Sequence, residues 1–230
     1  MKKFVLVAAL LIAVTAIGQS RFANKPGGQL TLGIRSATSL FSDESGVGTG
    51  FGGQFRLRFF HLLNSEWFAD YITSDLYNGL GNRTDYHIGW SVMFYPSFAY
   101  HQNERLKLQP YFLAGHCFDY TRCESNVLFE PNVASRWSSA VQAGLGCHLP
   151  LHDRLDLSFS AQYMIHLGTK INAVVRKNAG GLEYLYFDES QESGLEGHLL
   201  LTVSLNVRVA DLWKNTIKGV QDKKPMEEQQ

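Results

Sequence analysis

The sequence has no excess of charge of either sign. Its 230 residues contain 21 Lys and Arg against 21 Asp and Glu, so the formal net charge is zero. Nucleic-acid-binding domains need a clustered basic face, and this balance excludes nucleic acid as an expected partner. Charged residues make up only 18% of the chain, while aromatic residues make up 13%. Such a composition excludes intrinsic disorder, and the length suits one ordered domain.

Long apolar runs are absent after the N-terminus. No later segment approaches the roughly 20 residues of a transmembrane helix, which excludes a helical membrane bundle. The one apolar run, residues 4–13, follows Met1-Lys2-Lys3 and precedes Ala16-Ile17-Gly18. A basic start, an apolar stretch and small residues before a cut site form the pattern of a secretory signal peptide. We expect residues 1–18 to be removed before Gln19 and the chain to be exported; a membrane anchor is the weaker alternative.

Cysteine is scarce as well, with three residues in the chain. An exported protein permits disulfides, but an odd number leaves one thiol over. Cys117 and Cys123 are close enough in sequence to close a small loop, which would leave Cys147 unpaired in a strand. Three free thiols are an equally good alternative, because pairing cannot be read from a sequence.

What the sequence does contain is a period of two. Within residues 85–94, every even position is aromatic or aliphatic and the odd positions are mostly small or polar. This alternation is typical of a strand with two unlike faces. It recurs in residues 155–167 and 199–209 and, less regularly, in residues 30–36, 51–59, 67–73, 106–118 and 141–149. The pattern therefore predicts eight strands.

The connections between these segments also alternate in length. The long ones are residues 37–50, 74–83, 119–136 and 168–194, and the shorter ones are residues 61–66, 97–105 and 150–153. Short turns on one rim and long loops on the other are typical of outer-membrane barrels. We predict an all-β fold, an eight-stranded antiparallel up-and-down transmembrane β-barrel over residues 29–209. Residues 19–28 would form a periplasmic lead and residues 210–230 a periplasmic tail, with both termini in the periplasm.

Lysine is missing from most of the predicted strands. None occurs between Pro26 and Leu106 or between Leu108 and Thr169. A soluble barrel of the lipocalin kind, the alternative fold, would show lysine and glutamate on its outer face. The aromatic face therefore suits lipid and the small polar face suits a narrow lumen. Girdle candidates on the lipid face are Trp67, Tyr71, Trp90, Tyr95, Tyr111, Trp137 and Tyr163.

A family resemblance follows from these segments. The exported start, the eight alternating segments and the stretches at residues 109–115, 143–147 and 154–157 resemble the small outer-membrane β-barrel proteins of the porin family, similar to the OmpA membrane domain and OmpX. The resemblance implies an outer-membrane location, contact with outer-membrane lipid, and insertion by the barrel-assembly machinery. Members of that group commonly end on a terminal aromatic strand, whereas this chain continues for some twenty residues past Val209.

The interior of such a barrel is narrow enough to be filled by its own side chains. The predicted lumen residues are Arg56, Arg58, Asp70, His87, Gln142, Asp156, Gln162, His166, His198, Asn206 and Arg208. We expect a closed structural network, with a narrow small-solute channel as the alternative. No cofactor or metal is expected, because the histidines lack metal-ligand spacing. No Ser–His constellation is recognisable, so a lipid-modifying enzyme is only a further alternative.

The predicted loop at residues 168–194 carries apolar and aromatic side chains. Val174, Val175 and residues 182–187 would extend the last two strands into a protruding ribbon. Exposed edges and aromatic patches can bind partners, so a surface ligand is one hypothesis. The alternative is a loop that only shields the mouth of a monomeric barrel.

Overall fold

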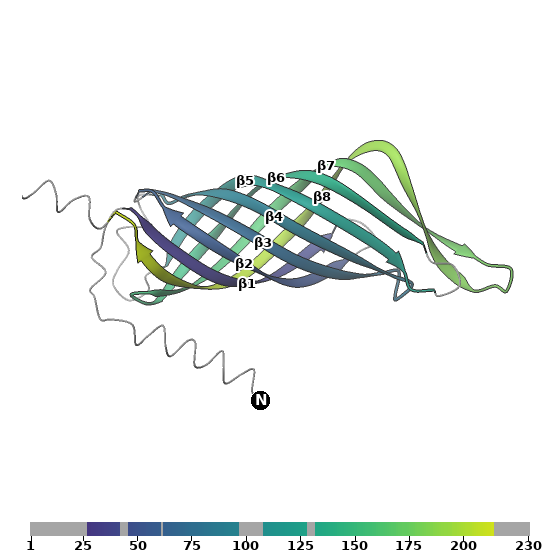
Figure 1. Ribbon diagram of the computed structural model, residues 1–230, viewed down its shortest axis with the longest axis horizontal. Helices are drawn as coiled ribbons and strands as arrows, with labels where there is room; N and C mark the ends of the chain where they lie inside the picture. Colours follow the sequence, from purple (N-terminus) through teal and green to yellow (C-terminus); the bar gives the residue numbers. More distant parts are fainter. Residues whose placement is uncertain (1–26, 42–45, 61, 97–107, 128–131, 214–230) are drawn as a thin grey trace, which may run out of the picture.

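The chain folds into a closed barrel of eight antiparallel strands in consecutive order (Figure 1). The computed structural model describes residues 27–41, 46–60, 62–96, 108–127 and 132–213. The strands are β1 (Gln29–Phe41), β2 (Val47–Arg58), β3 (Leu63–Leu76), β4 (Gly81–Phe94), β5 (Gln109–Ser125), β6 (Val133–His152), β7 (Leu155–Lys177) and β8 (Glu183–Asp211). The predicted fold class is confirmed. No helix in the described ranges is long and apolar enough to cross a membrane.

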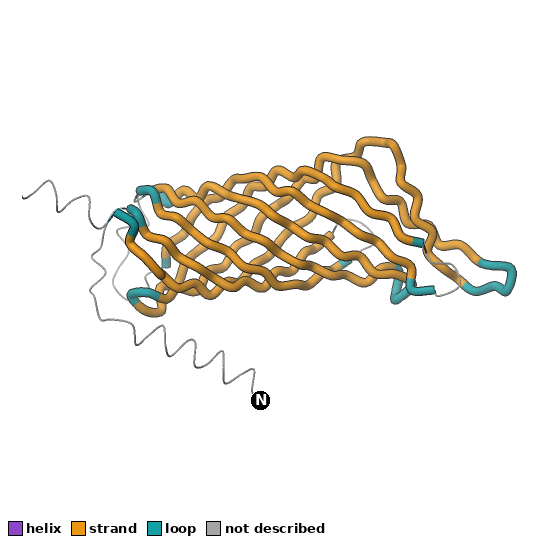
Figure 2. The backbone as a smooth tube through the Cα atoms, viewed as in Figure 1, coloured by secondary structure: helices purple, strands orange, loops and turns teal. Residues whose placement is uncertain are grey.

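The first and last strands close the barrel. β1 pairs with β8 from Gln29 opposite Asp211 to Phe41 opposite His198. The Gly28 amide donates to the Arg58 carbonyl at 2.7 Å, and the Leu212 amide donates to the Gly28 carbonyl at 2.7 Å. Both ends of the described chain therefore lie at the same end of the barrel, called here the inner end (Figure 2). The predicted signal peptide and most of the predicted tail lie outside the described residues.

The strands are longer than the sequence pattern predicts, and the connections are shorter. The predicted loop at residues 168–194 is mostly strand, because β7 continues to Lys177 and β8 begins at Glu183. The other predicted long connections are also shorter in the structure. In the turn between β3 and β4, Tyr77, Asn78 and Gly79 adopt positive φ. Strand pairing continues beyond the apolar band, where contact with lipid no longer imposes the period of two. The predicted connection at residues 97–105 lies outside the described residues.

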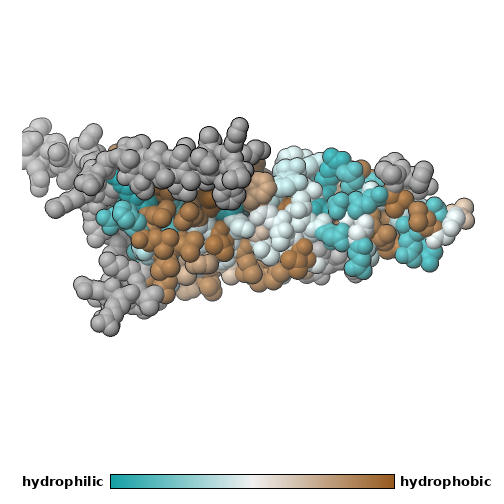
Figure 3. Space-filling view, turned by 90° about the horizontal axis from the view of Figure 1, so that it is seen from below, coloured by the Kyte–Doolittle hydropathy of each residue, from teal (hydrophilic) through white to brown (hydrophobic). Residues whose placement is uncertain are grey.

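The outward side chains form an apolar band near the inner end (Figure 3). Trp67, Trp90, Trp137 and Tyr163 are exposed on it, and Trp137 reaches 74% exposure. The half-buried Tyr71 also lies outside the barrel, where it packs edge-on against Tyr86. Two girdle predictions are wrong, because Tyr95 and Tyr111 are buried inside the lumen. Both occupy the same alternation phase as Met93 and Leu113, whose side chains point inward.

Of the two alternatives for the cysteines, the structure has three free thiols and no disulfide between Cys117 and Cys123. Both residues belong to β5, and both are buried thiols that form no disulfide. Six residues of strand separate their Cα atoms by about 20 Å, far beyond the reach of a disulfide. Cys147, on β6, forms no disulfide either.

Candidate functional site in the barrel lumen

A hydrogen-bonded cluster fills the lumen at the inner end, and we call it the inner cluster. Arg56 Nη2 donates to both carboxylate oxygens of Asp156 at 2.7 Å. Arg56 Nη1 lies 2.9 Å from His148 Nδ1. Asn206 Nδ2 donates to Asp156 Oδ1 and to Ser158 Oγ, each at 3.0 Å. Strands β2, β6, β7 and β8 are thereby joined across the lumen.

A second group, the middle cluster, is built on Arg35 of β1. Its Nε lies 3.1 Å from Asp70 Oδ1 and its Nη1 lies 3.5 Å from Glu66 Oε1. Arg35 Nη1 also donates to Gln54 Oε1 at 3.3 Å. Gln54 Nε2 in turn donates to Asn206 Oδ1 at 2.7 Å, which connects the middle cluster to the inner one. One guanidinium thus compensates two buried carboxylates.

Two lumen glycines make room for these networks. A Cβ atom on Gly33 would overlap Asn206 Oδ1, and one on Gly52 would overlap Asp70 Oδ1. Asn206 and Asp70 are the directly paired residues on the neighbouring strands, and their side chains occupy the space in front of the two glycines. The glycines on the polar face therefore serve packing of the lumen rather than flexibility.

A layer of apolar side chains separates the middle cluster from the outer half of the lumen. This apolar layer consists of Ala37, Phe68, Ile72, Cys117, Ala140, Met164 and Leu200, all buried. Along β7, Met164 stands between Gln162 and His166, and along β8, Leu200 stands between Thr202 and His198. Asp70, which pairs with Arg35, lies opposite His87 in the β3–β4 register, and Gln142 lies opposite Met164 in the β6–β7 register. The layer therefore replaces part of the polar lining of the lumen with apolar side chains.

Beyond the apolar layer lies a histidine cluster, formed by His87 of β4 and by His166 and His198 of β7 and β8, with Asp119 of β5. Asp119 Oδ1 lies 3.2 Å from His87 Nε2, and its Oδ2 lies 3.2 Å from His166 Nδ1. His166 Nε2 lies 3.0 Å from His198 Nδ1, and their rings stack with centroids 4.8 Å apart. All four side chains are buried.

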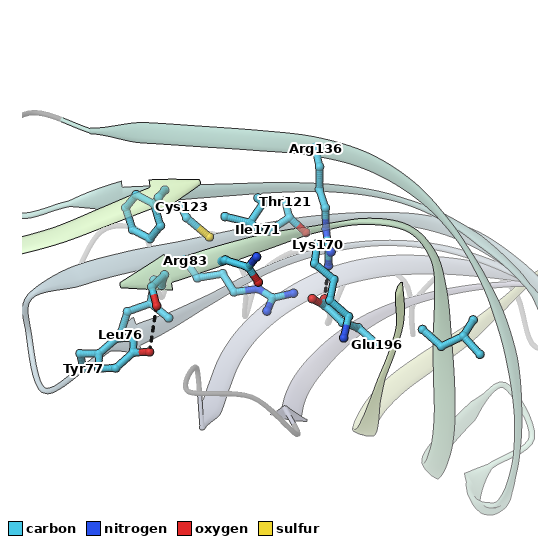
Figure 4. A pocket seen from close by; sticks show the side chains of 13 residues that line it. Leu76, Tyr77, Arg83, Thr121, Cys123, Arg136, Lys170, Ile171 and Glu196 are labelled. Atoms are coloured by element: carbon cyan, nitrogen blue, oxygen red, sulfur yellow. Dashed lines mark hydrogen bonds and ion pairs between the residues drawn. The ribbon is translucent and has the colours of Figure 1, made fainter. Parts of the chain in front are cut away.

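A cavity of about 370 Å³ opens outward from the histidine cluster, and we call it the vestibule (Figure 4). It is lined by Leu76, Tyr77, Arg83, Thr121, Cys123, Arg136, Lys170, Ile171, Asn172, Ala173, Phe187, Leu195 and Glu196. Arg136 is paired with Glu196, and its Nη1 donates to the Thr169 carbonyl at 2.7 Å. Arg83 pairs with Asp85 at 2.9 Å. The vestibule therefore has a polar floor and a partly apolar wall.

The apolar wall comes from a two-stranded ribbon, residues 171–189, in which β7 and β8 pair beyond the barrel (Figures 1 and 2). Leu185 and Phe187 of the ribbon pack against Leu76, Cys123 and Ala134. Tyr77 Oη also donates to the Ala173 carbonyl at 3.2 Å. Because Leu76 and Tyr77 belong to the opposite side of the barrel, the ribbon crosses the mouth. Its base is docked there, and its tip projects outward.

The structure places the eleven predicted lumen residues on the lumen side, but in separate groups, with Asp70 in the middle cluster and Asn206 in the inner one. Arg56 and Asp156 join the inner cluster, while His87, His166 and His198 form the histidine cluster. Gln142 donates to Ser91 Oγ at 2.7 Å, and Gln162 donates to Ser160 Oγ at 3.3 Å. Arg58 and Arg208 are half-buried at the inner rim. The Arg58 guanidinium stacks on the Tyr95 ring at 5.1 Å.

Sequence reasoning misses several lumen residues, among them Arg35, Glu66, Asp119 and His148. Asp119 is missed because the predicted strand ends at Phe118, one residue short. Extending the alternation of β5 by one residue would place it inward, in the same phase as Cys117. Glu66 and His148 lie at strand ends where the period is blurred.

The described chain brings together three Ser–His pairs that the sequence does not reveal. Two are buried in the lumen, where His148 Nδ1 lies 2.6 Å from Ser158 Oγ and His166 Nδ1 lies 3.2 Å from Ser138 Oγ. The third pair lies on the outer surface of β5 and β6, where His116 Nε2 lies 2.6 Å from Ser139 Oγ. No carboxylate is within ion-pair distance of His116 in the described part of the chain. A nucleophile needs an oriented base, so this pair by itself is no catalytic triad. The Ser139 hydroxyl instead provides a hydrogen-bond partner for the His116 imidazole within the apolar band.

Comparison with known proteins rests on structure alone. No protein-family description matches the chain, and no curated relative matches it. A major outer membrane protein from Thermus thermophilus aligns with a TM-score of 0.51 and 13% identity, covering 78% of this chain and 99% of that one. The chain has the fold of a small outer-membrane β-barrel. The resemblance found in the sequence is confirmed at the level of fold.

Two further barrels align over similar lengths. Neisserial surface protein A matches with a TM-score of 0.47 and 14% identity, covering 78% of this chain and 97% of that one. Ail, the attachment invasion locus protein of Yersinia pestis, matches with a TM-score of 0.45 and 16% identity, covering 78% and 99%.

The apolar layer leads to a prediction about conduction through this outer-membrane barrel. Ions cross a hydrophobic constriction poorly because they lose hydration without finding polar partners. We therefore expect the purified protein to give no stepwise current in planar lipid bilayers. A porin inserted in the same membrane controls for bilayer quality. Reproducible current steps of one amplitude would contradict a closed lumen and favour the narrow-channel alternative.

Proposed function

We propose that the protein is a surface-binding protein of the outer membrane that holds its partner on the ribbon. In this proposal residues 1–18 are a cleaved signal peptide, residues 19–28 and 210–230 lie in the periplasm, and the ribbon faces the exterior. The apolar band around the inner end and the outer-membrane fold support this orientation. The observation that carries the proposal is a ribbon that extends beyond a closed barrel.

The tip of the ribbon has features of a binding surface. Val174 and Leu182 are 48% and 51% exposed, although they lie outside the apolar band. The Arg176 guanidinium covers the Tyr186 ring at 3.8 Å, and Lys177 pairs with Glu183 at 3.2 Å. Exposed apolar side chains framed by charged ones are typical of interaction sites.

The ribbon also offers free strand edges. From Ile171 to Lys177, β7 pairs only with residues 183–189 of β8 within the described chain, whereas the barrel has no edges. An extended segment of a partner protein can add to such an edge through main-chain hydrogen bonds. We propose an extended segment of a surface or matrix protein as the partner. The docking of Leu185 and Phe187 on the mouth would hold the edge in place.

Adhesion of cells that display the protein tests this function. We expect such cells to be retained on immobilised extracellular-matrix proteins, and V174K/L182K to lower retention about tenfold, a loss near 1.4 kcal/mol. K177A/E183A is the matched control, because it removes only an exposed ion pair from the same ribbon. Equal retention of V174K/L182K and wild type would contradict the proposal. So would wild-type retention no higher than that of cells lacking the protein.

A further inference from the structure

We propose that the histidine cluster binds one divalent transition-metal ion inside the barrel. His87, His166 and His198 each offer a ring nitrogen, and these atoms lie within 4.8 Å of one another. The three residues come from β4, β7 and β8, so the site exists only in the folded barrel. Imidazole nitrogen is a preferred ligand of zinc, copper and nickel and a poor one for calcium or magnesium.

The distances suit coordination to a single ion. Zinc–nitrogen bonds of 2.0–2.1 Å place tetrahedral ligands about 3.4 Å apart. His166 Nε2 and His198 Nδ1 are already 3.0 Å apart. A ring nitrogen of His87 lies within 4.8 Å of nitrogens of the other two rings, so the His87 side chain must move inward to reach the tetrahedral spacing. Three imidazoles leave the fourth position to water.

One nitrogen of His87 lacks any partner. His87 Nδ1 is inaccessible to solvent and makes no hydrogen bond within the described chain, whereas His87 Nε2 has Asp119 Oδ1 at 3.2 Å. Buried polar atoms are nearly always paired, and an exception calls for an explanation. A metal ion bound to His87 Nδ1 supplies the missing interaction.

The charge of the site also calls for a cation. Asp119 is fully buried, and no Lys or Arg lies within ion-pair distance of it in the described ranges. The nearby Arg83 is committed to Asp85. A buried carboxylate is costly without a compensating positive charge, which a divalent ion provides.

Asp119 is also suited to orient the ligands. Its two oxygens lie 3.2 Å from His87 Nε2 and from His166 Nδ1. A carboxylate that holds the non-coordinating side of an imidazole fixes the ring and strengthens it as a ligand. The coordinating atoms are then Nδ1 of His87 and Nε2 of His166, and Asp119 is a positioning residue.

The vestibule gives an ion access from the outer side. Thr121 lines the vestibule, and its Oγ donates to Asp85 at 2.6 Å and to Asp119 at 3.1 Å. Arg83 lines it as well (Figure 4). One layer of side chains therefore separates the cavity from the histidine cluster. The apolar layer lies on the inner side of the histidine cluster, so exchange is expected through the vestibule.

Zinc titration of the whole barrel tests the site. Protein without a histidine tag, stripped by a chelator in detergent, should take up one Zn²⁺ per chain in competition with a chromophoric chelator. His87→Gln and His198→Gln should each weaken binding by more than about 100-fold, and Asp119→Asn by about 10–100-fold. His116→Gln, on the outer surface, and His148→Gln, in the inner cluster, are matched controls that should bind as wild type. Heat-modifiable gel migration verifies that each variant is folded.

A second measurement needs no variant. X-ray absorption of the zinc-loaded wild-type protein should show three imidazole ligands and one oxygen. Absence of stoichiometric Zn²⁺ uptake, or a spectrum without imidazole scattering, would overturn the proposal. Loss of binding in His116→Gln with retention in His198→Gln would do so as well, because it would assign the ion to the surface.

Discussion

Replacing Arg35 with alanine is expected to destabilise the barrel by about 3–5 kcal/mol, because it leaves two buried carboxylates without a cation. The Arg35 and Asp70 side chains are fully inaccessible and that of Glu66 is 7% exposed. The guanidinium also covers the Phe68 ring at 4.5 Å. Urea-induced unfolding followed by tryptophan fluorescence should show the transition midpoint shifted to lower urea.

Two variants serve as controls for this result. Arg122→Ala removes a surface pair with Glu124, whose side chains are about half exposed, and should change stability by less than about 1 kcal/mol. The triple variant R35M/E66Q/D70N removes all three charges together and should recover a large part of the loss. An Arg35→Ala barrel as stable as Arg122→Ala would contradict the assignment of Arg35 as the counter-charge.

Replacing Phe187 with alanine is expected to free the ribbon from the mouth. Phe187 packs with Leu185 onto Cys123, which is buried beneath them. Truncation of a buried phenylalanine costs about 3–5 kcal/mol, and each 1.4 kcal/mol changes an equilibrium tenfold. Labelling of Cys123 by a soluble thiol reagent should therefore accelerate by about 100-fold or more, measured by peptide mass spectrometry.

The chain contains its own reference for this experiment. Cys117 lies in the apolar layer and should stay unlabelled in the variant and in wild type. Leu182→Ala at the exposed tip should leave the labelling of Cys123 unchanged. Equal labelling rates of Cys123 in Phe187→Ala and wild type would show that the ribbon does not cover this thiol.

The fold could be predicted from the sequence because one physical signal repeats. Where a strand separates lipid from a polar lumen, as in residues 85–94, alternation is forced on every residue. Beyond the apolar band that constraint ends, so the outer parts of β7 and β8 are predicted as a loop although they pair as strands. Strand length depends there on main-chain pairing, which leaves no pattern in hydropathy.

The lumen was less predictable, because alternation gives a side chain's face but not its partner. Asp156 bonds Arg56 from another strand, and the histidine cluster joins residues of β4, β5, β7 and β8. These pairings depend on strand register and barrel tilt, which no single strand encodes. The short sequence spacing of Cys117 and Cys123 suggested a disulfide, but both residues lie on β5. Residues six apart on an extended strand are too far from each other to form one.

The inner and middle clusters bear on how many strands the barrel has. Gln54 of β2 donates to Ser204 Oγ and Asn206 Oδ1 of β8 at 3.1 and 2.7 Å, reaching past β1, which lies between them in the sheet. Arg56 reaches further, to Asp156 of β7. In a wider cylinder these groups would separate, because diameter grows with strand number. These hydrogen bonds across the lumen therefore favour a barrel of eight strands over a wider one, in which the same side chains could not reach each other.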